Sequence, residues 1–475
     1  MIFNNFLTES IKKKNLFYFF VIFFFIFFIL SNIKIYNLRS NYYDLGFYLN
    51  YYLNLINNNF DYVFNSNYQL ISFLIYPFLK ILPLYYWSYF LIFFQSLCVS
   101  LPIFFLKDRI LYICVYLLSA LLWFAVLTDF HPDVLIVPII FYINKLTDVN
   151  KINIKIFFLL VIILLIKFVY IFLVIGYLIY FYINRYRFDK IYIFSFLIFF
   201  LVYLFFFFSN VKVSTNNNII KLFHQIFTIN NFFNIITSKN ALITTLVLLS
   251  SCSFLVFNNW KKTIIILPLI LFYFILPSES YKKYYYHYYL PIFPIFIIIF
   301  IDTFDSFVKK YKNLYIKFLL LIIPLISNFI FSVSPISYSF LFSYKWAFEY
   351  KAYLIDNSIS LSRFKLNELL ISQSRNRKIN VMIENNVFFT KLINDNVIIK
   401  IFPDNSEFKN YDFILLKSTY PHFINDTICE EKYLFNCSNY DFINKYEKYL
   451  KKINQNLFQV YRDNNIIIFK NVQIR

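Results

Sequence analysis

Long apolar runs separated by short polar segments make up the first 335 residues of the chain. Most runs approach the length of about 20 residues that a helix needs to cross the hydrocarbon core of a membrane. The run at 68–84 is broken by Pro77, Lys80 and Pro83, so its pattern fits either a span or a re-entrant segment. Spans are predicted at residues 16–35, 85–106, 110–128, 134–144, 156–183, 191–209, 241–257, 263–277, 290–304 and 315–333.

The basic residues between these runs predict the orientation of the chain. If 68–84 does not cross and 156–183 is two short helices meeting near Lys167, the basic loops all share the side of the N-terminus. Short cytoplasmic loops carry an excess of lysine and arginine, so this side is expected to be the cytoplasm. The arrangement predicts about eleven spans in the inner (plasma) membrane. The segments expected outside are 36–67, the surroundings of His131 and Lys167, 279–289, and the chain after Pro335.

After Pro335 the chain becomes polar, and short alternating runs replace the long apolar ones. The sequence therefore predicts two domains. Residues 1–335 form an all-α polytopic membrane domain with an outer loop at 36–67, and residues 336–475 form a small α/β domain on the outer face. Strand-like runs lie at 380–383, 397–401, 412–416, 457–461 and 466–470, and helical patterns at 346–370 and 442–453.

Composition narrows the class of protein further. The chain is 60% hydrophobic and 24% aromatic, which excludes an ordinary soluble globular protein. A formal net charge of +20 is compatible with nucleic-acid binding, but the basic residues lie mostly in loops between apolar runs. We therefore predict no nucleic-acid partner. Most aromatic rings are expected to pack or to face lipid, so polar groups beside the apolar runs are the candidates for chemistry.

The segment after the first span contains the main catalytic candidate, Asp44, within the sequence NYYDLG at 41–46. Gly46 is one of only two glycines in the chain, which indicates a positive φ or a close approach at that position. A carboxylate at the outer membrane surface can act as a general base on a hydroxyl, or bind a divalent cation that neutralises a phosphate. The alternative is an ordinary loop acid followed by a turn glycine.

Three further ionisable residues lie at or inside apolar runs: His131, Asp133 and Lys167. Burying such groups at membrane depth is costly, so they tend to line a cavity or to pair. In the functional interpretation, Asp133 fixes the tautomer of His131, and Lys167 binds a phosphate. In the alternative, Pro132 breaks a helix, Asp133 caps the next one, and Lys167 snorkels to the membrane surface.

The loop at 279–289 combines Glu279, Lys282, Lys283 and His287 with several tyrosines. Lysines and hydroxyls suit a lipid-linked phosphate, and tyrosine rings suit stacking on a sugar. The aromatic belt at a membrane surface is the alternative explanation of the tyrosines, but it explains neither His287 nor Glu279.

The order of these segments resembles a bacterial family of predicted membrane proteins called domain of unknown function 2079. That family resembles the GT-C membrane glycosyltransferases, whose first outer loop carries a catalytic acid and whose donors are polyprenyl-phosphate sugars. The resemblance implies a GT-C-like fold in which Asp44 is the loop acid. It covers nearly the whole chain through short motifs: YDLG at 43–46, FHPD at 130–133, Lys167, HY at 287–288 followed by Pro291 and Pro294, VMI at 381–383, IFPD at 401–404 and YDFIL at 411–415.

Two positions depart from the pattern of that family. It usually has an acid directly after the intramembrane lysine, where this chain has Phe168. It also has a histidine ahead of the Pro77 segment, where this chain has Asn67 and Gln69. These departures bear on the activity of this chain more than on its fold.

The expected function is transfer of a sugar from a polyprenyl-phosphate donor to an acceptor at the outer face of the membrane. Asp44 is the expected base or metal ligand, and a divalent cation is the one cofactor considered. The expected partners are the lipid-phosphate-linked sugar and membrane lipid. The alternatives are a transporter or flippase, for which no inverted repeat is visible, and a non-catalytic envelope protein. The residues expected to bind the substrate are His131, Asp133, Lys167, Glu279, Lys282, Lys283 and His287.

Overall fold

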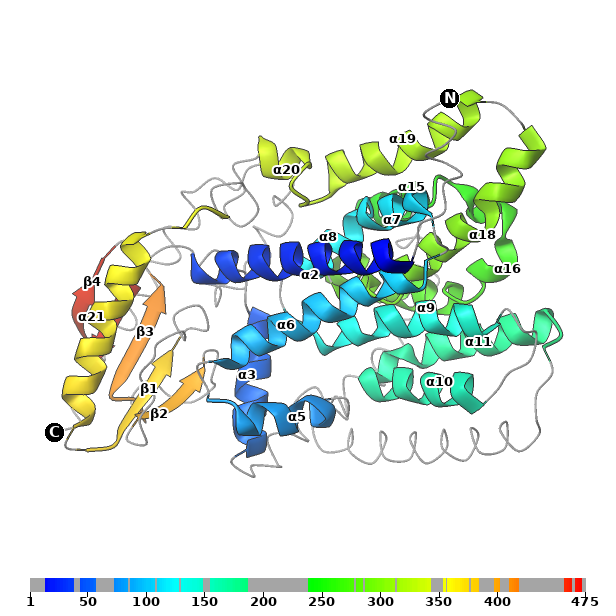
Figure 1. Cartoon of the computed structure of the whole chain (residues 1–475). Helices are drawn as coiled ribbons and strands as arrows, with labels where there is room; N and C mark the ends of the chain where they lie inside the picture. Colours follow the sequence, from blue (N-terminus) through cyan, green and yellow to red (C-terminus); the bar gives the residue numbers. More distant parts are fainter. Residues whose placement is uncertain are drawn as a thin grey trace.

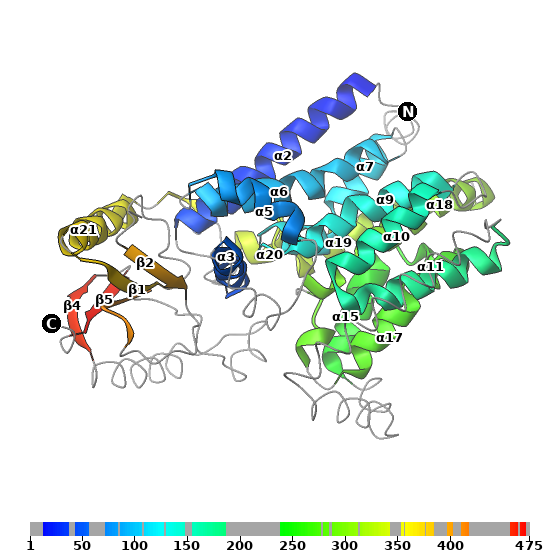
Figure 2. The ribbon, with the colours of Figure 1, turned by 90° about the horizontal axis from the view of Figure 1, so that it is seen from below.

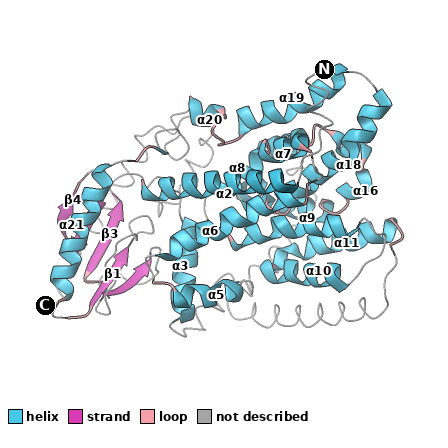
Figure 3. Ribbon diagram, in the orientation of Figure 1, coloured by secondary structure: helices cyan, strands magenta, loops and turns pink. Residues whose placement is uncertain are grey.

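A computed structural model shows a mostly helical chain with one small sheet near its C-terminal end (Figure 1, Figure 3). The predicted helices at 191–209 and 442–453 lie outside the described residues. The structure describes residues 13–37, 43–56, 72–83, 86–106, 109–127, 130–147, 154–186, 238–276, 279–284, 287–311, 314–342, 353–355, 357–375, 377–383, 397–401, 410–417, 457–463 and 466–471.

Among the described helices, Lys14–Tyr36 and Trp87–Phe104 are long and apolar enough to cross a membrane. The pair Ile110–Leu117 and Ala120–Leu127, bent by 59°, is a third candidate span. The figure of about eleven spans stays a prediction. The longer helices before the sheet are α2 (Lys13–Tyr36), α3 (Tyr43–Ile56), α5 (Ser72–Ile81), α6 (Trp87–Ser100), α7 (Ile110–Leu117), α8 (Ala120–Leu127), α9 (Ile136–Thr147), α10 (Ile154–Ile166), α11 (Ile171–Ile183), α15 (Lys239–Ser251), α17 (Leu267–Ile275), α18 (Phe293–Tyr311) and α19 (Leu314–Phe331).

The helices lie side by side in a bundle with two chemically different ends (Figure 1, Figure 2). The starts of α2 and α7 and the ends of α9 and α18 share one end, which we call the basic end. The ends of α2 and α8, the starts of α9 and α18, and the break between α10 and α11 share the other, which we call the site end. This separation matches the charge pattern of the sequence, whereas the side that faces the cytoplasm stays a prediction. The basic end carries Lys14, Arg109, Lys145, Lys262, Lys309 and Lys310.

Two irregular segments follow the expectations from the sequence. The long apolar run at 156–183 forms two short helices, α10 and α11, joined by Lys167 and the turn η4 (Phe168–Tyr170). The segment around Pro77 forms α5, which has 10 residues. A helix of this length extends about 15 Å, roughly half the hydrocarbon thickness. That the whole segment at 68–84 does not cross stays a prediction.

The segment around Asp44 is helical rather than a loop. Helix α3 begins at Tyr43, so both Asp44 and Gly46 lie in its first turn. No glycine in the described part of the chain has a positive φ. The interpretation of Gly46 as a turn glycine is therefore wrong.

The other glycine, Gly176, permits the close approach of two segments. A Cβ atom at this position of α11 would lie 2.0 Å from the carbonyl oxygen of Ile265, just before α17. Any side chain here would force these backbones apart. Small residues at such contacts are typical of helices that pack closely in membranes.

Apolar side chains are exposed along the outward faces of several helices. In the most apolar 18-residue stretch of α2, only 17% is buried inside the protein. Soluble proteins rarely expose contiguous apolar surface of this extent, so these faces are compatible with contact to lipid. The exposed residues include Phe17, Ile22, Phe25 and Ile29 of α2, Phe73, Leu74 and Phe78 of α5, and Phe318, Leu319, Leu325, Ile326 and Ile330 of α19.

The C-terminal sheet has the strand order β2-β1-β3-β5-β4. Strand β1 pairs in parallel with β2 and β3, and β5 pairs antiparallel with β3 and β4. Each predicted strand lies within one residue of an observed one. Helix α21 (Asn357–Ser374), which includes residues 357–370 of the helix predicted at 346–370, packs on the sheet. The strands are β1 (Ile379–Ile383), β2 (Val397–Ile401), β3 (Phe413–Lys417), β4 (Phe458–Arg462) and β5 (Ile466–Lys470).

Helix α3 lies between the bundle and the sheet (Figure 1). One buried apolar cluster joins α3, α5 and α6 with α21 and the inner strands. The side-chain amide of Asn37, just after α2, also donates to the carbonyl of Leu354 ahead of α21, at 2.5 Å. The sheet is therefore attached to the site end of the bundle.

Candidate functional site

Asp133 and Lys167 form an ion pair at the site end of the bundle. Nζ of Lys167 lies 3.1 Å from Oδ2 of Asp133. The Asp133 side chain is fully buried, and that of Lys167 is 26% exposed. Two breaks in helical structure place these residues, because Asp133 lies in the turn η3 (Pro132–Leu135) and Lys167 lies between α10 and η4. The ion pair accounts for both buried charges without a helix cap from Asp133 or a snorkelling Lys167.

His131 is buried beside this pair and contacts α3. Its backbone N–H donates to Oε1 of Gln95 at 3.3 Å. The ring of Tyr48, in α3, meets the imidazole edge-on with 5.9 Å between ring centroids. Asp133 makes no hydrogen bond to His131 among the described contacts, and its Oδ2 pairs with Lys167. A role of Asp133 in fixing the histidine tautomer therefore stays a prediction.

Three residues that the sequence interpretation missed hold the chain ahead of His131. The Gln95 side chain uses both ends, since its amide nitrogen donates to the Val126 carbonyl at 3.0 Å while its oxygen accepts from His131. Ser31 donates to the same carbonyl at 3.0 Å, and Lys34 donates to the carbonyl of Leu127. These carbonyls end α8 and lack partners within the helix, so the contacts cap it. The sequence signals were a lone amide in the run at 85–106 and a lysine near the end of the first span.

A group of tyrosines lies against Lys167. The ammonium of Lys167 is 5.4 Å from the ring centroid of Tyr288, in the turn η7 (His287–Tyr289). The ring of Tyr281, in the turn η6 (Glu279–Lys282), lies 4.5 Å from that of Tyr288. Tyr273 of α17 contacts both rings. The structure thus brings the loop at 279–289 to the Asp133–Lys167 pair.

For the other predicted site residues, the structure gives fewer side-chain contacts or only the position of the backbone. Lys282 and Lys283 are buried, and the backbone carbonyl of Lys282 accepts a hydrogen bond from Thr244 at 2.5 Å. Asp44 lies in the first turn of α3, four residues before Tyr48, while Glu279 and His287 begin η6 and η7. The side chains lying outside the described part of the structure are those of Asp44, Phe168, Glu279 and His287.

Several buried polar atoms around Asp133 have unused hydrogen-bonding capacity. Within the described part of the chain, Oδ1 of Asp133 and the hydroxyls of Tyr170 and Tyr273 make no hydrogen bond of ordinary geometry. The Asp133 carboxylate acts electrostatically on both tyrosines. Leaving such a group without a partner costs about 1–3 kcal/mol. All three atoms are buried, so any partner for them must itself lie inside the bundle.

The described residues contain no group of three or more His, Cys, Asp or Glu side chains arranged to hold a metal ion. Asp133 is engaged with the cationic Lys167, which disfavours a second cation at the same carboxylate. A divalent cation at Asp44 stays a prediction.

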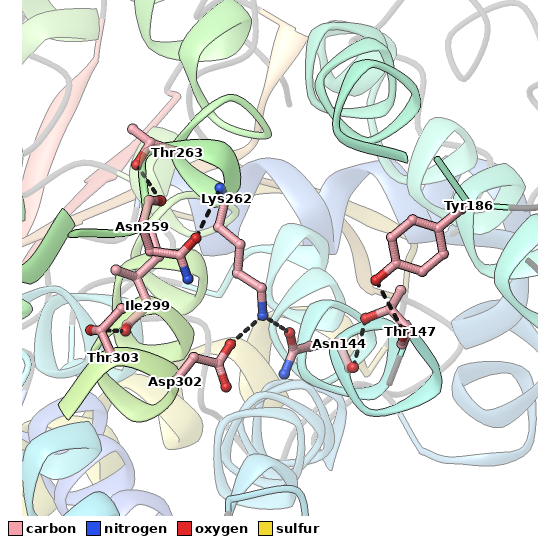
Figure 4. Close-up of polar contacts among 9 residues, drawn as sticks. All are labelled: Asn144, Thr147, Tyr186, Asn259, Lys262, Thr263, Ile299, Asp302 and Thr303. Carbon is pink, nitrogen blue, oxygen red and sulfur yellow. Dashed lines mark hydrogen bonds and ion pairs between the residues drawn. The ribbon is translucent and has the colours of Figure 1, made fainter. Parts of the chain in front are cut away.

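A second polar cluster lies at the basic end of the bundle (Figure 4). Nζ of Lys262 donates to the Asp302 carboxylate and, at 2.6 Å, to Oδ1 of Asn144. Arg109 pairs with Asp305 at 2.5 Å. Both acids belong to α18, so the two pairs attach the start of α7 and the short helix α16 (Trp260–Thr263) to α18. This cluster shares no residue with the site end.

Comparison with known proteins found no matching family model, no matching curated protein and no matching solved structure.

Proposed function

We propose that this chain is a multi-pass membrane glycosyltransferase of GT-C type that uses a polyprenyl-phosphate sugar as donor. The observation that supports the proposal is the contact between Tyr48 and His131. Tyr48 belongs to α3, whose first turn contains Asp44, and His131 lies two residues before Asp133, which pairs with Lys167. A candidate base and a candidate phosphate-binding cation thus belong to one end of the bundle, beside the sheet domain.

In the proposed reaction, Asp44 removes a proton from a hydroxyl of the acceptor. The hydroxyl oxygen attacks the anomeric carbon of the donor sugar, and the bond from that carbon to the phosphate oxygen breaks. The proton remains on the Asp44 carboxyl group, and the electron pair leaves with the polyprenyl phosphate. Cations aimed at the departing phosphate stabilise the charge that develops there.

Lys167 is suited to meet that phosphate. A lysine ammonium has three donor hydrogens, and Asp133 accepts one of them. The pair therefore holds the Lys167 ammonium in place at the site end. Lys282, Lys283 and His287 are the other proposed contacts of the donor phosphate, and His131 supports the contact between α3 and the bundle.

The proposal is tested by transfer of radiolabelled sugar from polyprenyl-phosphate donors in membranes that contain matched amounts of each variant. We expect Asp44→Asn to lower transfer at least about 100-fold, the usual contribution of a general base. Asp305→Asn is the control, because it removes a carboxylate at the basic end, and its transfer should stay within about threefold of wild type. Wild-type membranes that transfer no sugar from any donor would overturn the proposal.

A transporter of a lipid-linked substrate is the second candidate. It is favoured by the charged contacts at both ends of the bundle, Asp133–Lys167 at one and Lys262–Asp302 at the other. Alternating access requires contacts of this kind to open in turn. Movement of a fluorescent polyprenyl phosphate across vesicles containing the protein, without sugar transfer, would favour this function.

A further inference from the structure

The described side chains around the Asp133–Lys167 pair differ in exposure. Asp133 is fully buried, and His131, Tyr273 and Tyr289 are buried as well. By contrast, the Lys167 side chain is 26% exposed, and Tyr281 and Tyr288 are only partly buried. Among the described side chains of this cluster, the Lys167 ammonium and the rings of Tyr281 and Tyr288 are therefore the accessible groups.

Hydrogen bonds hold the backbone of the two turns that carry these rings. The hydroxyl of Tyr289 donates to the Tyr281 carbonyl at 2.8 Å, which ties η7 to η6. Thr244 of α15 donates to the next carbonyl, that of Lys282. On the side of the bundle, the Tyr273 ring lies nearly parallel to that of Tyr281, with an angle of 9° between their planes. The two rings are therefore packed against each other and against the bundle before any ligand binds.

The chemistry of this surface selects among ligands. Aromatic faces attract the weakly positive C–H groups on one face of a sugar ring, and a neighbouring ammonium binds a phosphate. A quaternary ammonium headgroup would also suit tyrosine rings, but the Lys167 cation already lies against the Tyr288 ring and would repel it. A ligand with an anionic group next to an uncharged ring fits both features.

We infer that Tyr281 and Tyr288 form a sugar subsite. The sugar ring of a lipid-phosphate-linked donor stacks on these two side chains while its phosphate contacts Lys167. This inference rests on the proposed function, and it adds which residues distinguish the sugar-bearing lipid from the bare lipid phosphate.

The test compares two probes on the purified full-length chain in lipid nanodiscs. One probe is polyprenyl phosphate, and the other is the same lipid carrying glucose, galactose or mannose. We expect wild type to bind at least one sugar-bearing lipid about tenfold more tightly than the bare lipid. Tyr288→Leu and Tyr281→Leu should abolish this preference and leave binding of the bare lipid unchanged.

Tyr288→Phe is the matched variant, because it keeps the ring and removes only the hydroxyl. We expect it to keep the preference for the sugar-bearing lipid. Lys167→Met should instead weaken binding of both probes. If both leucine variants weaken binding of the two probes equally, the rings serve only to hold Lys167. The sugar subsite is then overturned, while the proposed donor stands. If wild type binds neither probe, the proposed donor is overturned and the subsite with it.

Discussion

The role of Lys167 depends on a residue that lies 34 positions away in the sequence. A lone lysine within an apolar run has two alternatives, pairing inside the protein or reaching the membrane surface. The run itself does not distinguish them, because both need only a flexible chain and a nearby helix end. The carboxylate of Asp133, 3.1 Å from the Lys167 ammonium, decides for pairing.

This pair predicts unequal effects of removing its two members. Lys167→Met leaves a fully buried carboxylate without its cation and should lower the free energy of unfolding by about 3–5 kcal/mol. Asp133→Asn should cost less, because the Lys167 side chain retains 26% exposure. The double variant should be more stable than Lys167→Met alone. Equilibrium unfolding in mixed micelles measures all three.

Lys310→Met is the control for this comparison, since Lys310 is exposed at the basic end. It removes the same charge without leaving a buried partner, so we expect a change within about 0.5 kcal/mol. Additive effects of Lys167→Met and Asp133→Asn would contradict the pairing, because independent residues do not couple.

At the scale of helices, local breaks determine where the site forms. Asp133 follows a proline, Lys167 separates α10 from α11, and Tyr288 lies in a short turn between α17 and α18. Each polar residue thus lies where backbone hydrogen bonds are already interrupted. The sequence indicated these breaks, because a proline or a lone charge interrupts an apolar run.

The contact between α11 and the segment before α17 predicts the effect of a single methyl group. Gly176→Ala places a Cβ 2.0 Å from the Ile265 carbonyl oxygen, so the two segments must separate. We expect a net loss of about 1–3 kcal/mol, because overpacking outweighs the better helix propensity of alanine. The thermal midpoint of the purified protein measures it, and Ile175→Ala, at an exposed position of α11, is the control. An unchanged midpoint for Gly176→Ala would contradict the close contact.

At the scale of the whole molecule, the basic loops and the site residues lie at opposite ends of one bundle (Figure 1). The ion pairs Lys262–Asp302 and Arg109–Asp305 belong to the first end, and Asp133–Lys167 belongs to the second. If the positive-inside rule orients the chain, the sheet and the site face outward together.

This orientation predicts which positions a reagent reaches from outside the cell. In a variant whose five cysteines are replaced by alanine, Gln459→Cys on β4 should react with a membrane-impermeant maleimide in intact cells. Lys310→Cys should react only after permeabilisation, since it lies at the basic end. Both positions are exposed in the structure, so lysed cells serve as the control for reactivity. The reverse pattern would contradict the predicted orientation.

The sequence by itself determined the elements of this protein more fully than their contacts. Apolar runs and alternating patterns depend on neighbouring residues, so they predicted the helical bundle, the break at Lys167, the short segment at Pro77 and the five strands. The helical spacing at 45–56 also indicated α3, which begins two residues earlier, so that Asp44 lies in the helix rather than in a loop before it.

Tertiary structure alone decided which polar groups meet. The pairing of Asp133 with Lys167, the caps from Gln95 and Lys34, and the contact of Lys167 with Tyr288 all join segments far apart in the chain. Such contacts depend on how helices pack, which the local pattern does not specify. The physical reason is that burial makes a polar group need a partner, while only the packed bundle determines which partner lies within reach.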